Sequence, residues 1–188
     1  MNLQIIISGI GGQGVVFGSK VLFQAALLKG LKVIGSETHG MAQRGGSVVS
    51  HLKIGDFHSP LIRAGAADMI YAFEEAEFLR TLPFIKNRGI CFVNTGRNIL
   101  TGSEIEKYLI RKHVRVLPID AGRIARELKA PLSVNLIMLG FSVPSNCLPF
   151  SRTDMEETIE KISPHGSSEM NLKAFRAGHK NWQSNLIK

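Results

Sequence analysis

The chain has 188 residues, of which 44% are hydrophobic and 20% are charged, a balance typical of a globular protein and not of a disordered one. Its net charge is +8, but the basic residues are spread along the chain and are not interleaved with aromatic residues. We therefore predict no nucleic-acid partner, and an acidic protein or a phosphate-bearing ligand fits the charge better.

Two cysteines, Cys91 and Cys147, limit the metal chemistry available to this chain. A cubane iron–sulfur cluster is usually held by four thiolates, which this chain cannot supply alone. The His and Cys residues have no metal-ligand spacing, so we predict no metal site. The apolar N-terminus lacks the basic start of a signal peptide, and no apolar run reaches the roughly 18 residues of a membrane span. We expect a cytoplasmic protein without membrane contact.

The first elements of the chain predict a strand, a helix and a second strand. Leu3–Ser8 is a continuous apolar run, which is typical of a central parallel strand. A helix follows from Gly14 to about Lys29 and ends at Gly30, which suits the residue after a helix. The second strand is predicted at Leu31–Gly35. Such a unit predicts a right-handed crossover and a parallel sheet.

The segment Ser47–Ile54 alternates between apolar and polar residues, which predicts a half-exposed strand, at an edge or antiparallel. Three further strands are predicted at 69–73, 89–94 and 114–119. Ser103 with Glu106 has capping-box spacing and predicts a helix to about residue 112. Asp120 is predicted to cap a helix that extends through Leu128.

Beyond Pro131 the pattern becomes mostly helical. Helices are predicted at 134–141, with Gly140 as a close-packing point, and at about 170–186. Thr153 with Glu156 predicts another capping box, opening a helix to about residue 162. We therefore predict a single α/β domain over residues 1–188. It has a Rossmann-like, mostly parallel open sheet flanked by helices at about 1–130 and a helical C-terminal segment at about 131–188.

A glycine-rich loop joins the first predicted strand to the first helix. Its spacing, with glycines at Gly9, Gly11, Gly12 and Gly14, satisfies the fingerprint of dinucleotide-binding proteins. Glu37 lies roughly where an acid that binds the ribose belongs. One interpretation is a free-standing NAD-dependent dehydrogenase or another Rossmann-type nucleotide-binding protein. A simpler alternative is that the glycines only allow the turn to pack tightly.

Two features weaken the dehydrogenase interpretation. Gln13 places a polar amide between the glycines, where dehydrogenases often have a small or apolar residue. A second glycine-rich segment, and not a continuing helix, follows the second strand. In addition, only about 55 residues remain after the α/β part to bind a substrate, which is short for a separate substrate domain.

The second glycine-rich segment covers Ser36–Gly46 and carries Glu, His, Gln and Arg side chains. Functional groups on a loop are expected where a ligand or partner is bound. Because both glycine-rich segments lie within the first 46 residues, we expect them to form two walls of one site. The candidate catalytic residues are Glu37, His39 and Arg44, and the candidate cofactor-binding residues are Gly9, Gly11, Gly12, Gln13, Gly14, Gly40, Gln43, Arg44, Gly45 and Gly46.

Together, the two glycine-rich segments resemble the gamma subunit or domain of the 2-oxoacid:ferredoxin oxidoreductases. Among these, they are most similar to the small (beta) subunit of the indolepyruvate ferredoxin oxidoreductases. The resemblance continues through residues 50–55, 135–140, 148–150 and 171–178, and so covers most of the chain.

This resemblance implies a subunit and not a complete enzyme. In the family, a 2-oxo acid is decarboxylated on thiamine diphosphate, coenzyme A takes the acyl group, and electrons pass through iron–sulfur clusters to ferredoxin. Thiamine diphosphate, magnesium and the clusters are then expected on a large partner subunit. This agrees with the two cysteines and with the absence of a Gly-Asp-Gly motif, since Gly55-Asp56 is followed by Phe57.

The resemblance also implies that the two segments form a wall of a composite active site. Arg44 would then counter a substrate carboxylate or a phosphate of coenzyme A. His39 would donate a hydrogen bond or relay a proton, and Glu37 would orient either residue. Each side chain also has ordinary structural uses, such as a loop-anchoring salt bridge for Arg44. A scaffold protein without a catalytic contribution is a further alternative.

Overall fold

A computed structural model describes residues 1–39, 45–96 and 104–185. Its centre is an open sheet with strand order β2-β3-β1-β4-β5-β6. The strands are β1 (Leu3–Ile10), β2 (Val33–His39), β3 (Ser47–Ile54), β4 (Ala67–Ala72), β5 (Ile85–Asn94) and β6 (Arg115–Ile119). The neighbours β1, β4, β5 and β6 are parallel, whereas β3 pairs antiparallel with both β1 and β2.

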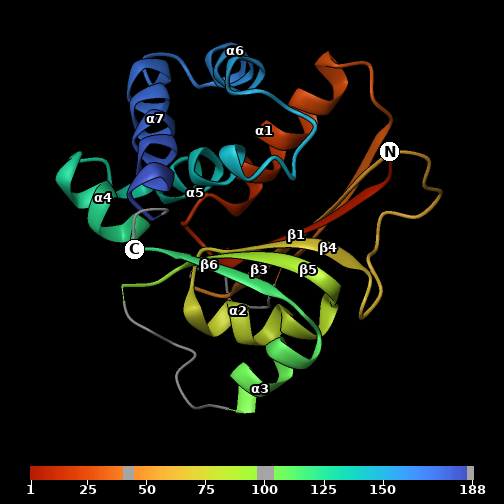
Figure 1. Cartoon of the computed structure of the whole chain (residues 1–188). Helices are drawn as coiled ribbons and strands as arrows, with labels where there is room; N and C mark the ends of the chain where they lie inside the picture. Colours follow the sequence, from red (N-terminus) through yellow and green to blue (C-terminus); the bar gives the residue numbers. More distant parts are fainter. Residues whose placement is uncertain (40–44, 97–103, 186–188) are drawn as a thin grey trace.

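Helices cover both faces of the sheet (Figure 1). On one face lie α1 (Val15–Leu28), α4 (Ala121–Glu127), α5 (Val134–Ser142), α6 (Arg152–Ile162) and α7 (Ser168–Asn185). On the other face lie α2 (Glu75–Thr81) and α3 (Glu104–Arg111). Short 3-10 turns occur at Leu82–Phe84, Pro131–Ser133 and Val143–Ser145. The predicted α/β fold with a helical C-terminal segment is confirmed.

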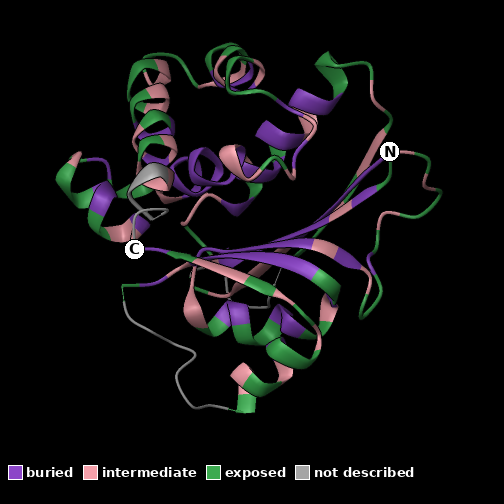
Figure 2. Cartoon of the chain, viewed as in Figure 1, coloured by how far each residue is buried: buried purple, intermediate pink, exposed green. Residues whose placement is uncertain are grey.

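Each face of the sheet has its own hydrophobic core, because side chains alternate along a strand. On β1, Ile5 and Ile7 join the core under α1, α5 and α7, while Ile6 joins the core under α2. Full burial of a side chain of this size contributes about 1.5–3 kcal/mol to stability. Figure 2 shows the buried strands between the two helical layers.

The first two strands are not neighbours, which corrects the expected parallel pair. β3 lies between them, with Leu52 opposite Ile5 of β1 and Ser50 opposite Glu37 of β2. β1 and β2 still run in the same direction, because each is antiparallel to β3. Of the two arrangements expected from the alternation of β3, an edge position or antiparallel pairing, the structure has antiparallel pairing.

β3 is also more buried than its alternation suggested, because His51 and Lys53 are only 6% and 8% exposed. The segment between β3 and β4 covers them. The Nδ1 atom of His51 accepts the backbone N–H of Ile62 at 3.2 Å, and the ammonium of Lys53 lies 5.1 Å from the ring centroid of Phe57. Burial and the charge of Lys53 lower the pKa of His51.

The residues at the starts of the helices agree with some of the capping predictions and contradict one. Asp120 caps α4 as predicted, accepting the backbone N–H of Arg123 at 2.8 Å. The capping box at Thr153 is wrong, because Ser151 and Asp154 form it instead. The described part of α3 ends at Arg111, close to the predicted residue 112, and the predicted cap Ser103 lies outside the described residues.

Two glycines allow α5 and α7 to touch backbone to backbone. A Cβ at Gly140 would lie 1.9 Å from the carbonyl oxygen of Phe175, and one at Gly178 would lie 1.9 Å from that of Ile137. Gly140 is thus a close-packing point, as predicted. This contact gives a physical reason for glycine in both C-terminal segments that carry the resemblance.

Candidate functional site

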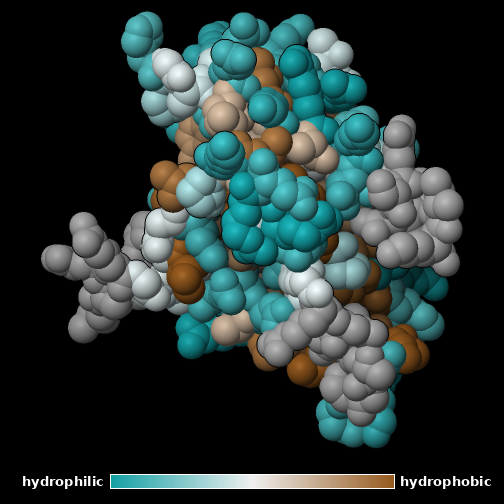
Figure 3. Space-filling view, turned by 90° about the vertical axis from the view of Figure 1, so that its left-hand side faces the viewer, coloured by the Kyte–Doolittle hydropathy of each residue, from teal (hydrophilic) through white to brown (hydrophobic). Residues whose placement is uncertain are grey.

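The glycine-rich loop after β1 and the described ends of the second glycine-rich segment lie at the edge of the sheet where the parallel strands end, which faces the viewer in Figure 3. Hydrophilic side chains dominate this face in the figure. β1 leads into α1 on one face of the sheet, and its neighbour β4 leads into α2 on the other. Such a topological switch point is where open α/β sheets commonly bind ligands.

The glycine-rich loop after β1 is held by contacts inside the protein. Gly14 has φ +74° and begins α1, and its carbonyl oxygen accepts the Nδ2 donor of Asn135 at 3.0 Å. A Cβ at Gly14 would lie 2.3 Å from that nitrogen. A Cβ at Gly9 would lie 2.8 Å from Oε1 of Gln13. Glycine at these two positions is required by packing and backbone geometry.

Gln13, which distinguished this loop from that of dehydrogenases, has a defined role. Its Oε1 accepts the backbone N–H of Ile10 at 3.0 Å, and its Nε2 donates to Oε2 of Glu74 at 3.1 Å. The side chain therefore fixes its own loop and joins it to Glu74, the N-cap residue of α2. A carboxylate at this switch point would repel the pyrophosphate of a dinucleotide.

The two glycine-rich segments are in contact with each other. The backbone N–H of Gly11 donates to the carbonyl oxygen of Gly46 at 2.9 Å. A Cβ at Gly11 would lie 3.3 Å from the backbone nitrogen of Gly45. The structure thus brings both segments, as far as they are described, onto one continuous surface.

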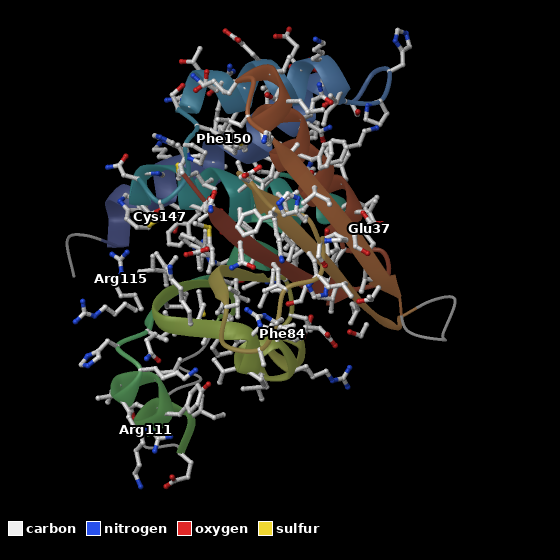
Figure 4. All side chains as sticks on the ribbon, turned by 90° about the vertical axis from the view of Figure 1, so that its right-hand side faces the viewer. Glu37, Phe84, Arg111, Arg115, Cys147 and Phe150 are labelled. Atoms are coloured by element: carbon white, nitrogen blue, oxygen red, sulfur yellow. The ribbon has the colours of Figure 1, made fainter. Side chains whose placement is uncertain are left out.

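Glu37 lies on the edge strand β2, where Figure 4 shows it on the outermost strand. It lines a hollow of about 420 Å³ between α1 and strands β2 and β3, together with Lys20, Phe23 and Ser36. β3 separates Glu37 from β1, so two strand spacings, or roughly 10 Å, lie between them. This is not the position of a ribose-binding acid, which lies on the strand next to β1 in the dinucleotide fold.

His39 ends β2 opposite Val48. The side chain of His39, and all of Gly40, Gln43 and Arg44, lie outside the described residues. Their roles stay predictions. Sequence reasoning also placed the whole segment from Ser36 outside regular structure, whereas the strand continues to His39.

The start of α2 contributes residues that the sequence did not single out. Glu77 is buried, and its Oε2 accepts the hydroxyl of Ser47, the residue after Gly46, at 2.6 Å. The neighbouring Glu75 accepts the hydroxyl of Thr95 at the end of β5. Three carboxylates within four residues directly after a buried strand, at 74, 75 and 77, were the available signal.

The described residues contain no group of three His, Cys, Asp or Glu side chains that is placed to hold a metal ion. Cys91 is buried beneath the α2 face, and burial strongly raises the pKa of its thiol. Cys147 packs against the core of the other face, with its Sγ 3.6 Å from Nη2 of Arg115 (Figure 4). Among the helices described, none is both long and apolar enough to cross a membrane.

Comparison with known proteins connects this geometry to a family. Residues 4–181 match the pyruvate ferredoxin/flavodoxin oxidoreductase family. The chain belongs to this family. It is 36% identical to the indolepyruvate oxidoreductase subunit IorB of Archaeoglobus fulgidus, over 95% of this chain and 94% of that protein. It is 29% identical to the 2-oxoglutarate synthase subunit KorC of Methanothermobacter thermautotrophicus, over 93% and 92% of the two chains.

A solved structure supports the fold. The 2-oxoglutarate:ferredoxin oxidoreductase of Magnetococcus marinus matches 97% of this chain with a TM-score of 0.78 and 21% identity. This chain covers 31% of that longer one. The resemblance to gamma-type subunits is confirmed, and the relatives give no support to a free-standing NAD-dependent dehydrogenase.

Proposed function

We propose that this chain is the small subunit of a thiamine-diphosphate-dependent 2-oxoacid:ferredoxin oxidoreductase that acts on indolepyruvate or a similar arylpyruvate. The family and the indolepyruvate oxidoreductase relatives support this assignment. The observation that carries it is the contact between Gly11 and Gly46, which joins both glycine-rich segments into one surface at the end of the parallel strands. In this proposal, that surface completes an active site on a partner subunit.

The cofactors belong to the partner subunit in this proposal. Cys91 is buried on one face of the sheet and Cys147 packs on the other, so the cysteines of this chain do not fit an iron–sulfur cluster. Thiamine diphosphate, magnesium and the clusters would all be held by a large subunit. Coenzyme A would be the cosubstrate and ferredoxin the electron acceptor of the complex, which would work in the cytoplasm.

Within the joined surface, we assign roles to three side chains. Arg44 would bind a carboxylate of the 2-oxo acid or a phosphate of coenzyme A, because a guanidinium suits both groups. His39 would donate a hydrogen bond or relay a proton. Glu37 would orient one of them from β2.

We further propose that residues 1–188 act as a single domain. The hydrophobic core under α1 supports this, since it contains Ile5 of β1 together with Phe175 of α7. The helical C-terminal segment would then be part of the same folding unit. Coincident unfolding of the sheet and of α7 would be the expected behaviour.

The test is a pull-down of the tagged chain from its own host without oxygen. The expected result is a brown partner that contains thiamine diphosphate, and an eluate that reduces a dye when given indolepyruvate and coenzyme A. Pyruvate and 2-oxoglutarate, assayed separately, would show the preferred substrate, and the tag alone serves as the control. A colourless chain without a partner would overturn the proposal, and NAD binding would be the next assay.

A further inference from the structure

Glu77 is a buried acid on a helix at the surface of the protein. Its side chain is 1% exposed, yet it lies on a helix with solvent on one side. Burying a carboxylate is unfavourable unless hydrogen bonds satisfy it. Two groups do so here: the hydroxyl of Ser47 at 2.6 Å, and Nη1 of Arg80 at 2.8 Å.

The two hydrogen-bond partners of Glu77 belong to different parts of the chain. Arg80 belongs to α2 itself, one turn further on, and is 66% exposed. Ser47 is the first residue of β3, directly after Gly46. The hydroxyl-to-carboxylate bond is charge-assisted, and such bonds are short and strong. Glu77 therefore connects α2 to the end of the second glycine-rich segment.

The connection continues to the first glycine-rich segment. The carbonyl oxygen of Gly46, next to Ser47, accepts the N–H of Gly11 at 2.9 Å. Two successive hydrogen bonds thus lead from α2 through residues 46–47 to the loop after β1. A shift of Ser47 would move Gly46 and would change the place where the two segments meet.

The bond to Arg80 is an ordinary i,i+3 pair within α2, but a helix-stabilising role does not account for the bond to Ser47, which lies outside the helix. Acids in the first turn stabilise a helix through its dipole and by capping backbone N–H groups. Glu74, the N-cap residue of α2, makes no side-chain capping bond and binds Gln13 of the glycine loop instead. The oxygens of Glu77 are likewise taken by Ser47 and Arg80.

We propose that Glu77 is a positioning residue that acts through Ser47, and this rests on the function proposed above. By fixing Ser47, it sets the end of the segment that carries Arg44 and the contact of that segment with Gly11. An apolar side chain of similar volume would fill the same space without a desolvation penalty, but it could not accept the hydroxyl of Ser47.

The first test measures backbone exchange in the full chain. Ser47→Ala removes the bond to the loop, and Arg80→Ala is the matched control because it removes the other bond of the same carboxylate. We expect Ser47→Ala to speed hydrogen exchange at the Gly11 amide roughly tenfold, as loss of a bond to a charged group implies. Arg80→Ala should leave that amide unchanged, and Ser47→Thr, which keeps the hydroxyl, should restore it.

The second test measures kinetics in the assembled complex. Ser47→Ala and Glu77→Gln should each lower kcat/KM about tenfold at an unchanged yield of complex, and the double variant should be no worse than the single ones. Kinetics equal to those of Arg80→Ala would overturn the positioning role, even if exchange at Gly11 increased. An inactive wild-type complex would instead refute the proposed function, while the exchange experiment would still test whether Glu77 anchors the segment.

Discussion

Replacing Gly178 by Ala should weaken the packing of α7 on α5. The added Cβ would lie 1.9 Å from the carbonyl oxygen of Ile137, and also 2.7 Å from its carbonyl carbon. Side-chain Cβ atoms do not approach other heavy atoms within about 3 Å, so the helices must separate by roughly 1 Å. A gap of that size forfeits about a quarter to a half of the dispersion energy at each contact.

The size of the effect follows from two opposing contributions. Overpacking at a rigid backbone contact is expected to destabilise by about 3 kcal/mol. The better helix propensity of alanine stabilises the folded state by about 1 kcal/mol. A net loss of about 2 kcal/mol corresponds to a decrease in Tm of roughly 4–8 °C for a chain of this size.

Thermal unfolding followed by circular dichroism measures this change, with Gly122→Ala on α4 as the matched control. A Cβ at Gly122 would meet its nearest neighbour, Nη1 of Arg126, at an ordinary 3.5 Å. The control should therefore keep or raise Tm through helix propensity alone. If Gly178→Ala unfolds at the same temperature as Gly122→Ala, the argument from the backbone contact is refuted.

Two further predictions concern the glycine loop and pH. Gly14→Ala should lower Tm more than Gly12→Ala in parallel melts. Both positions have positive φ, but only the new Cβ at Gly14 would clash, at 2.3 Å from the side chain of Asn135. Equal decreases in Tm would show that backbone strain alone determines the loss of stability. Bonds from Arg176 and Arg152 lower the pKa of Glu156 from 4.5 to about 2. Because the folded pKa lies below the unfolded one, the stabilisation is present above about pH 4.5 and is lost as pH falls toward 2. Glu156→Gln should therefore have a lower Tm than the wild type at pH 7 and the same Tm near pH 2, and a difference that persists at pH 2 would contradict this cause.

The elements that the sequence predicted well are those whose signal is local. The apolar run of β1, the glycine after α1 and the cap at Asp120 depend on neighbours within a few residues. The insertion of β3 between β1 and β2 is not local, since alternation shows which side chains share a face and not which strands are adjacent. The strand beyond Gly35 was missed because an edge strand tolerates polar residues such as Glu37.

The capping box was missed for a different reason. Ser151 with Asp154 and Thr153 with Glu156 have the same spacing, and only the contacts of Glu156 with Arg152 and Arg176 distinguish them. The acidic cluster at 74, 75 and 77 marks the region, but the burial of Glu77 could not be predicted from its residue type, because an acid near a helix start is usually solvated. Its burial depends on Ser47, which is 30 residues away.

The glycine fingerprint of this chain is explained largely by contacts within the protein. Gly9 makes room for Gln13, Gly14 for Asn135, and Gly11 for the backbone of Gly45. A dinucleotide site needs the same glycines so that a phosphate can approach the helix. Here the side chain of Gln13 and the carboxylate of Glu74 meet at the switch point instead.

The backbone of Gly11 and Gly12 stays exposed at this edge, next to Gly45. The part of the loop that the protein does not use for its own packing therefore faces outward. In the function proposed above, this exposed backbone, joined to the second glycine-rich segment by the bond from Gly11 to Gly46, is the part of the loop that would face the partner subunit.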